Sequence, residues 1–340
     1  NSTSIVEFKN IIIATGSRSI QLPNAPKSNL IWNSKDALRL DSIPERMLVI
    51  GAGYIGLELG TVYASLGSEI TMVEMADHIL PGADRDLINP LKKKITKKYK
   101  KILTSTKVEN ITIKNNLLNV HFSNDESNFE DDFDVVFVSI GRIPNTNDLG
   151  LENTSIKQDD KKLIITDGRM MSNVDGIYAI GDVTDGPMLA HKASYEGKIA
   201  AENIANMKSL NDARAIPCVI YTEPEIAWVG ITENEAISNG IEYGKGEFPW
   251  IASGRAVASG TSEGKTKVIF DRNSKKIIGG GIVGSNAGEI ISEIALAIEM
   301  GADAEDLSLT IHPHPTLSET ISNASEVFEG TVTDIFIPKK

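Results

Sequence analysis

The sequence predicts an α/β fold, with a Rossmann-like dinucleotide-binding domain followed by a C-terminal α+β domain. The first part places a glycine-rich turn between two apolar strand-like segments and opens a helix there, which is the order of a βαβ unit. From Pro217 onward the pattern changes to successive strand-like segments and one long helix. That change is typical of a separate α+β module.

Apolar runs, and the residues that end them, predict the elements of the first part. Residues 47–50 form a buried-strand pattern, and the helix that follows reaches Leu66, where Gly67 is suited to end it. The expected order is a strand at 10–16, a connection at 17–45, a strand at 47–50, a helix to Leu66, a strand at 70–74, a lysine-rich helix at 84–101, antiparallel strands across 107–137 and a buried strand at 135–140.

The second part begins with a strand that ends at a Gly-Asp pair. The expected elements are a strand at 177–182, a helix at 190–206, a polar linker at 208–216, strands at 219–222, 226–229, 266–271 and 276–283, and a helix at 286–300.

Composition narrows the classes of function. The 340 residues are 41% apolar and 24% charged, which is ordinary for a soluble globular protein. A net charge of −12 argues against general nucleic-acid binding. No apolar run approaches the roughly 20 residues of a membrane span. The single cysteine, Cys218, excludes an internal disulfide and favours a reducing compartment.

The glycine-rich turn carries the strongest chemical signal. Residues 51–56 read Gly51-Ala52-Gly53-Tyr54-Ile55-Gly56, after a strand and at the start of a helix. The first glycine permits the tight turn, the second lets a pyrophosphate approach the backbone, and the third allows the helix to pack on the strand. Glu74 ends the next strand, 23 residues after Gly51, where a carboxylate accepts hydrogen bonds from ribose hydroxyls. Its negative charge disfavours a 2′-phosphate, so the pattern predicts NAD rather than NADP.

Two further motifs have more than one interpretation. Asp182, after Gly181, lies at a strand end where ligands bind in open α/β sheets, but a turn-capping aspartate fits the pattern about as well. Residues 312–319 read His-Pro-His-Pro-Thr-Leu-Ser-Glu, which places two imidazoles near a carboxylate on a backbone restricted by prolines. A histidine held beside a carboxylate can transfer protons near neutral pH.

Taken together, these segments resemble the flavoprotein disulfide reductases over nearly the whole chain. The resemblance rests on Ala-Thr-Gly-Ser at 14–17, the turn at 51–60, Ser-Ile-Gly-Arg-Ile-Pro-Asn at 139–145, Gly-Ile-Tyr-Ala-Ile-Gly-Asp at 176–182, Pro-Met-Leu-Ala-His at 187–191, Tyr-Thr-Glu-Pro-Glu-Ile-Ala-Trp-Val-Gly at 221–230, and residues 312–319.

The resemblance implies sites for two cofactors, NAD and FAD. NAD would contact Gly51, Ala52, Gly53, Tyr54, Ile55, Gly56 and Glu74, with Val108 near the adenine and Ser139, Ile140, Gly141 and Arg142 on the far wall. FAD would contact Thr15, Gly16, Gly181, Asp182, Met188, Leu189, Ala190 and His191. Glu58 matches a carboxylate that faces the contact between flavin and nicotinamide.

The resemblance also implies a reaction and partners. The implied reaction oxidises dihydrolipoamide, a small-molecule dithiol, and passes electrons through FAD to NAD, as the E3 component of 2-oxo acid dehydrogenase complexes does. His314 would be the catalytic base and Glu319 its orienting carboxylate, with His312 as the alternative base. A homodimer and a lipoyl domain are the implied partners, and the bacterial cytoplasm is the expected location, with the mitochondrial matrix as the alternative.

The implied domains are a remnant of an FAD-binding domain at 1–40, an NAD-binding domain at 41–148, a central FAD-binding return segment at 149–212, and a dimerisation domain at 213–340. Neither a first glycine-rich FAD turn nor a Cys-x4-Cys redox pair is found in the sequence. We therefore expect an N-terminal truncation, and a chain that alone binds NAD and dimerises without redox catalysis. The alternatives are another reductase of this class, or a non-catalytic NAD-binding or assembly module.

Overall fold

The structure, a computed structural model, describes residues 4–336 and divides into two compact units. Unit 1 comprises the described residues up to Ile20 together with Gly141–Ala213. Unit 2 comprises Gln21–Ile140 together with the described residues from Arg214 onward. Unit 2 holds both a parallel sheet and an antiparallel sheet, so the predicted fold class, Rossmann-like α/β plus a C-terminal α+β module, is confirmed.

The parallel sheet of unit 2 has the strand order β3-β10-β4-β5-β6. Its strands are β3 (Ile31–Trp32), β10 (Val135–Val138), β4 (Arg46–Ile50), β5 (Glu69–Val73) and β6 (Lys101–Leu103). Both faces are covered, which explains the continuous apolar runs. Met47 and Val49 of β4 join one hydrophobic cluster, whereas Leu48 and Ile50 join another on the opposite face.

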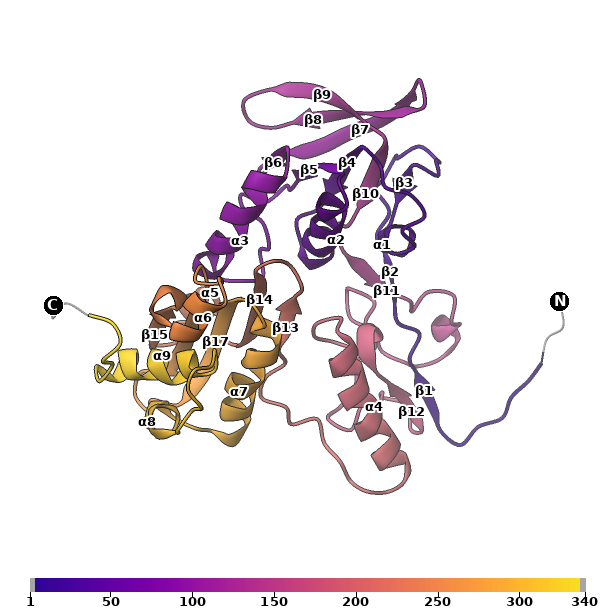
Figure 1. Cartoon of the computed structure of the whole chain (residues 1–340). Helices are drawn as coiled ribbons and strands as arrows, with labels where there is room; N and C mark the ends of the chain where they lie inside the picture. The colour runs from indigo at the N-terminus through magenta and orange to yellow at the C-terminus, as the bar shows by residue number, and fades with distance from the viewer. Residues whose placement is uncertain (1–3, 337–340) are drawn as a thin grey trace. The chain divides into compact units, whose positions relative to one another are not determined.

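Helices cover one face of this sheet and a three-stranded antiparallel sheet contributes to the other (Figure 1). The helices are α1 (Ser34–Ala37), α2 (Tyr54–Ser65) and α3 (Arg85–Lys98), and the second sheet consists of β7 (Lys107–Lys114), β8 (Leu117–Ser123) and β9 (Asn128–Phe133). The antiparallel prediction for this stretch is therefore confirmed. The predicted connection at 17–45 contains β3 and α1, which are too short to show a sequence period.

The C-terminal part of unit 2 is an antiparallel sheet in the order β13-β14-β17-β16-β15. Its strands are β13 (Cys218–Ile220), β14 (Glu225–Gly230), β17 (Ile277–Gly284), β16 (Lys265–Asp271) and β15 (Tyr243–Pro249). Its helices are α5 (Glu233–Ser238), α6 (Gly254–Ala258), α7 (Ala287–Met300), α8 (Ala304–Leu309) and α9 (Glu319–Glu329). Ile294 of α7 and Ile321 of α9 meet in the core that this sheet supports.

Helix α9 lies very close to β15, and the sequence prediction did not include either element. A Cβ atom at Gly246 would lie 1.7 Å from the carbonyl oxygen of Ala324. Only glycine therefore allows the backbones to approach this closely. Phe328 of α9 stacks on Phe270 of β16, with 4.4 Å between ring centroids. These contacts fix the position of α9 on the sheet.

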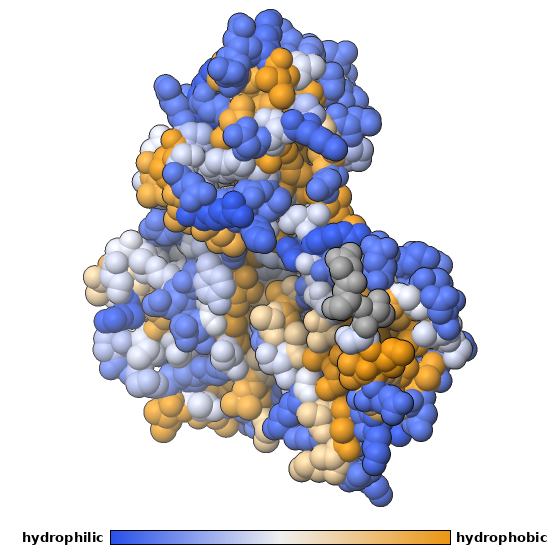
Figure 2. Space-filling model, turned by 90° about the vertical axis from the view of Figure 1, so that its right-hand side faces the viewer, coloured by the Kyte–Doolittle hydropathy of each residue, from blue (hydrophilic) through white to orange (hydrophobic). Residues whose placement is uncertain are grey.

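Unit 1 contains two small sheets and one long helix. Its elements are β1 (Ile11–Ile13) paired with β12 (Ile177–Ala179), β2 (Ser17–Ser19) paired with β11 (Arg142–Pro144), and α4 (Ala190–Ile204). Ile5 and Val6 are 92% and 77% exposed. Figure 2 shows one face of the molecule, where apolar patches lie among hydrophilic surface. None of the helices within residues 4–336 has the length and apolar character that a membrane crossing requires.

Candidate active site

The glycine-rich turn lies between β4 and α2, at the carboxyl end of the parallel sheet. Gly51 has a positive φ of +96°, and a Cβ at Gly56 would lie 2.1 Å from the carbonyl oxygen of Gly51. Gly53 is the N-cap residue of α2. Because glycine has no side chain, the first turn of this helix has no side-chain cap. A Cβ at Gly53 would meet nothing within 4 Å. The turn thus leaves open space beside the start of α2, where the helix dipole favours an anion.

Glu74 is held against this turn by two backbone N–H groups. Ala52 N donates to Glu74 Oε2 at 2.8 Å, and Ala76 N donates to Oε1 at 2.9 Å. Each carboxylate oxygen keeps a further lone pair for a hydroxyl donor. The predicted pair, glycine turn and acid, is therefore in contact.

The other predicted NAD contacts are divided between the two units. Ser139 Oγ donates to the carbonyl oxygens of Ile50 and Gly51, at 3.0 Å each. Val108 packs against the cluster that includes Ile50 and Val73. Ser139, Ile140 and Val108 thus belong to unit 2 with the turn, whereas Gly141 and Arg142 belong to unit 1. Arg142 donates to Ser17 Oγ at 2.7 Å and to the Ser17 carbonyl oxygen at 2.8 Å.

The predicted FAD residues all lie in unit 1. Thr15 Oγ1 donates to the Asn145 carbonyl oxygen at 2.7 Å, and Asn145 N donates to the Gly16 carbonyl oxygen at 2.8 Å. Ser17 Oγ donates to Asp182, which links the first strands to the Gly-Asp turn. Met188, Leu189, Ala190 and His191 lie at the start of α4, whose N-cap Leu189 offers no capping side chain.

A buried ion pair below the Gly-Asp turn was not predicted from the sequence. Lys192 Nζ lies 2.9 Å from Glu196 Oε1 and donates to the Gly181 carbonyl oxygen at 3.1 Å. Glu196 Oε2 accepts from Gly181 N at 2.6 Å. Both side chains are at most 5% exposed, so the pair fixes the backbone of Gly181. The i, i+4 spacing of Lys192 and Glu196 could have indicated an ion pair, but the same spacing is equally common on exposed helix faces.

His314 and Glu319 are in direct contact, as the resemblance implies. His314 Nδ1 lies 2.8 Å from Glu319 Oε1, and Thr316 N donates to Glu319 Oε2 at 2.6 Å. Because a carboxylate only accepts, the contact places the imidazole proton on Nδ1. The His314 side chain is 78% exposed, so Nε2 is available to a reactant. The His314–Pro315 peptide bond is cis.

His312 has a different environment. Its side chain is 7% exposed, Nε2 lies 2.6 Å from Glu293 Oε1 of α7, and Nδ1 lies 2.9 Å from the Thr310 carbonyl oxygen. Both ring nitrogens are thus engaged by the protein. The geometry therefore favours a structural role for His312, whereas the imidazole of His314 is largely exposed.

Glu58 and Cys218 are both shielded from solvent in unit 2. Burial raises the pKa of Glu58, although a 2.9 Å hydrogen bond from Tyr221 N to its carboxylate opposes that shift. Burial, together with the charge of Glu235, raises the pKa of the Cys218 thiol. A thiol that resists ionisation is a poor nucleophile, so Cys218 is not suited to redox chemistry.

Three carboxylates outside these sites lie close enough to hold a cation. Asp84, Asp86 and Glu233 present ligand atoms within 4.8 Å of one another. The ammonium group of Lys267 already contacts all three, at 2.7 to 2.8 Å. Burial alone would raise the pKa of Asp86, but hydrogen bonds from Lys265 and Lys267 outweigh it and lower this pKa to about 2. Sequence reasoning did not identify this cluster.

Comparison with known proteins agrees with this geometry. Residues 1–197 match the family described as "Pyridine nucleotide-disulphide oxidoreductase", and residues 216–325 match its dimerisation domain. A dihydrolipoyl dehydrogenase of Haemophilus influenzae is 49% identical over 97% of this chain and 69% of its own length. One from Buchnera aphidicola of Schizaphis graminum is 51% identical over 98% of this chain and 70% of its own length.

Solved structures show the same architecture. LpdA from Mycobacterium tuberculosis superposes with a TM-score of 0.85 at 28% identity, over 93% of this chain and 69% of that chain. The HOCl-induced flavoprotein disulfide reductase RclA from Escherichia coli gives a TM-score of 0.84 at 25% identity, over 94% of this chain and 73% of that chain. From these matches and the geometry above, the chain belongs to the pyridine nucleotide-disulphide oxidoreductase family.

Proposed function

We propose that this protein is a dihydrolipoyl dehydrogenase, which oxidises the dithiol of dihydrolipoamide and transfers the electrons through FAD to NAD. The observation that carries the proposal is the exposed imidazole of His314 held by Glu319. A base of this kind is needed for thiol chemistry and has no use in a purely structural module. The names of relatives that are about half identical to the chain support the same substrate.

The residues of unit 2 fit NAD. The open space beside Gly53 and the uncapped first turn of α2 suit the pyrophosphate, and Glu74 suits the adenosine ribose. We propose that Tyr54, Ile55 and Val108 add apolar contacts, and that Ser139 and Ile140 complete the part of the site that lies in unit 2. The contacts of Gly141 and Arg142 with NAD stay a prediction.

The residues of unit 1 fit FAD. Asp182 offers a carboxylate for hydroxyls of the ribityl chain, and Met188 to His191 form the start of α4, where no side chain caps the helix. Thr15 and Gly16 stand at the end of β1, tied to Asn145. FAD and NAD, when bound, supply the two-electron chemistry that amino acid side chains lack.

The chain's own contribution to the reaction is proton transfer. His314 Nε2 accepts the proton of a substrate thiol, which leaves a thiolate able to attack a redox disulfide. The sequence, with its single cysteine, does not itself supply that disulfide. Glu319 accepts from Nδ1–H, fixes the tautomer that exposes Nε2, and stabilises the imidazolium that forms. Thr316 N–H holds Glu319 in place. Cys218, the sole cysteine of the printed sequence, does not serve as the redox thiol, because its pKa is raised by burial.

The reaction gives a direct test of the proposal. Protein produced from the complete reading frame that contains this sequence, and supplied with FAD, should reduce NAD with dihydrolipoamide as donor. It should use NADP at least about tenfold less efficiently because of Glu74. Steady-state NADH production measures both. Activity only with NADP, or only with a different dithiol or disulfide, would contradict the proposal. NADH binding without any turnover would favour the non-catalytic module instead.

We also propose a homodimer formed through the C-terminal sheet and its helices, and docking to a lipoyl domain in the bacterial cytoplasm. The match of residues 216–325 to a dimerisation domain supports the dimer. So do four exposed apolar side chains on and after α7: Leu296, Met300, Leu309 and Ile311, which are 62%, 76%, 72% and 96% exposed. Exposed apolar side chains gathered in one region mark an interaction surface.

Ile311→Glu is expected to weaken the dimer. Burying an isoleucine side chain contributes about 1.5–3 kcal/mol, and a twofold interface counts each residue twice. The dissociation constant should therefore rise at least roughly a hundredfold. Sedimentation equilibrium measures the change. The matched control is Ile113→Glu, since Ile113 is 51% exposed on β7, in a different sheet. Equal dissociation constants for the two variants would exclude this surface.

A further inference from the structure

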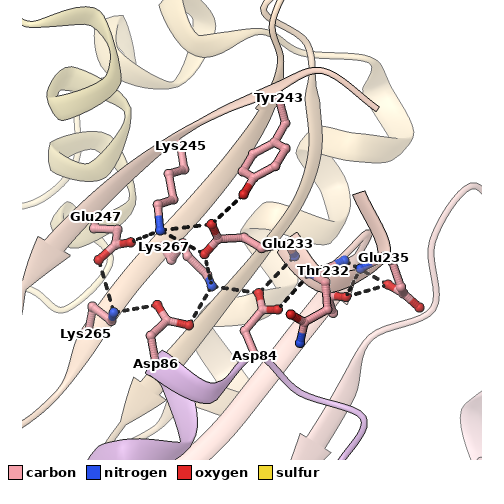
Figure 3. A network of polar contacts seen from close by, with 11 residues as sticks. Asp84, Asp86, Thr232, Glu233, Glu235, Tyr243, Lys245, Glu247, Lys265 and Lys267 are labelled. Atoms are coloured by element: carbon pink, nitrogen blue, oxygen red, sulfur yellow. Dashed lines mark hydrogen bonds and ion pairs between the residues drawn. The ribbon is translucent and has the colours of Figure 1, made fainter. Parts of the chain in front are cut away.

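A buried lysine connects the C-terminal sheet to the start of α3. Lys267 on β16 is fully buried, and its ammonium group donates to Asp84 at 2.7 Å and to Asp86 and Glu233 at 2.8 Å each (Figure 3). Burial alone would lower the pKa of Lys267, but these three carboxylates outweigh it and raise the pKa. The ammonium therefore stays charged, and each acid it contacts is paired.

Asp84 contacts both parts of unit 2, the dinucleotide-binding part and the C-terminal part. It is the N-cap residue of α3, from the dinucleotide-binding part. Its carboxylate also accepts from Glu233 N at 3.1 Å and Asn234 N at 3.3 Å, at the start of α5 in the C-terminal part. Figure 3 shows Asp84 between Lys267 and this helix start. Both oxygens of Asp84 are thus fixed by residues of the C-terminal part.

A connecting loop, residues 75–84, joins Asp84 to the glycine turn. Ala83 N donates to the Leu80 carbonyl oxygen at 3.1 Å, and Leu80 N donates to the Ala52 carbonyl oxygen at 2.9 Å. Ala52 N in turn donates to Glu74. Both backbone groups of Ala52 are therefore held, one by Glu74 and one by the connecting loop.

The connecting loop is held in a strained conformation. Leu80 has a φ of +51°, in the left-handed region that a branched side chain rarely adopts. Its side chain is 3% exposed, and those of Ile79 and Ala83 are 0% and 1% exposed. Such a conformation persists only where the surroundings determine it fully. The buried side chains hold the middle of the loop, and Lys267 holds its end at Asp84.

We propose that Lys267 is a positioning residue for NAD: by fixing Asp84, it holds the connecting loop in the conformation that clamps Ala52 and places Glu74. The inference rests on the proposed function, because it assumes that NAD binds at residues 51–56 and Glu74. It adds that the C-terminal part of the chain sets the affinity of the dinucleotide turn, although Lys267 does not touch the nucleotide.

The test compares two lysines of the same network. Lys267→Met leaves Asp84 without a cation at the start of α3, whereas Asp86 keeps Lys265 and Glu233 keeps Lys245. The connecting loop should therefore loosen, and the affinity for NADH and for ADP-ribose should fall roughly three- to thirtyfold. Lys245→Met is the matched control, because Lys245 contacts Glu233 and Glu247 but neither aspartate of α3. NADH fluorescence and calorimetry with ADP-ribose measure affinity, and hydrogen exchange of residues 75–84 reports the loop.

Asp84→Asn is the second variant, and it tests the role of Lys267 if the Lys267→Met protein does not fold. It keeps an oxygen acceptor for α5 but loses the charge that Lys267 contacts. The inference holds if Asp84→Asn, and Lys267→Met where it folds, bind more weakly with faster loop exchange, while Lys245→Met binds like the parent. Parent-like affinity in Asp84→Asn, or an equal loss in Lys245→Met, overturns it. A parent protein that binds neither NADH nor ADP-ribose overturns the proposed function, and the inference with it.

Discussion

Replacing His314 with glutamine should lower dithiol-dependent NADH production by roughly two to four orders of magnitude, because a positioned general base contributes about that factor. Glutamine retains a polar side chain of similar length but cannot take up the thiol proton at neutral pH. NADH affinity should not change, because His314 is not among the residues assigned to NAD. Steady-state turnover with dihydrolipoamide and NAD, together with an NADH titration, separates the two quantities.

His312→Gln is the matched control, since it changes the other histidine of the same segment. His312 is buried against Glu293, so its loss should lower the free energy of unfolding by about 1–3 kcal/mol. Turnover per folded molecule, and the pH at which turnover rises, should stay close to the parent. If His312→Gln removes turnover and His314→Gln does not, the assignment of the base is wrong.

Gly53→Ala and Gly56→Ala should separate dinucleotide binding from folding. At Gly53 an added Cβ meets nothing within 4 Å and φ is −75°, so the fold should tolerate alanine. The methyl group would nevertheless occupy space beside the turn that the pyrophosphate needs. We expect NADH affinity to fall at least roughly tenfold, a loss of about 1.4 kcal/mol.

Gly56→Ala should act on stability instead. Its Cβ would lie 2.1 Å from the Gly51 carbonyl oxygen and 2.7 Å from Ser139 Oγ, so α2 must move away from β4. Overpacking of this kind costs about 1–3 kcal/mol or more. Thermal unfolding should show a lower Tm for Gly56→Ala and an unchanged Tm for Gly53→Ala. Parent-like NADH affinity in a folded Gly53→Ala protein would argue against nucleotide binding at this turn.

The dinucleotide turn could be predicted from sequence because its determinants are local. Gly51, Gly53 and Gly56 lie close together in the sequence. Strands β4 and β5 are largely apolar because both faces of the sheet are covered. Glu74 follows β5 directly, at the same edge of the sheet as the turn. Each of these features is visible without knowledge of distant contacts.

Contacts between distant segments could not be predicted in this way. Lys267 lies in a strand whose lysines are expected to face water, and it is buried because α3 supplies Asp84 and Asp86 from far away in the sequence. The environment of His312 depends on Glu293, which belongs to another helix. For His314 the sequence offered two histidines and one carboxylate, and only exposure and geometry distinguish their roles.

The omission of β15 and α9 has a similar cause. The strand Tyr243–Pro249 contains two glycines and a lysine, which weaken its apolar alternation. The glycines are there because α9 occupies the space that side chains would fill, at Ala324 and Phe328. The sequence of this strand is therefore atypical, whereas in the folded chain its glycines make room for α9.

The close packing of α9 on β15 also affects the position of the His314–Glu319 pair. Glu319 is the first residue of α9, so the carboxylate that orients His314 moves as one body with the helix. The depth to which α9 settles on β15 is limited at Gly246, where a single methyl group would meet the Ala324 carbonyl oxygen at 1.7 Å. An alanine at Gly246 would therefore lift the helix and carry Glu319 with it. A position without a side chain thus sets the alignment of Glu319 with the imidazole of His314.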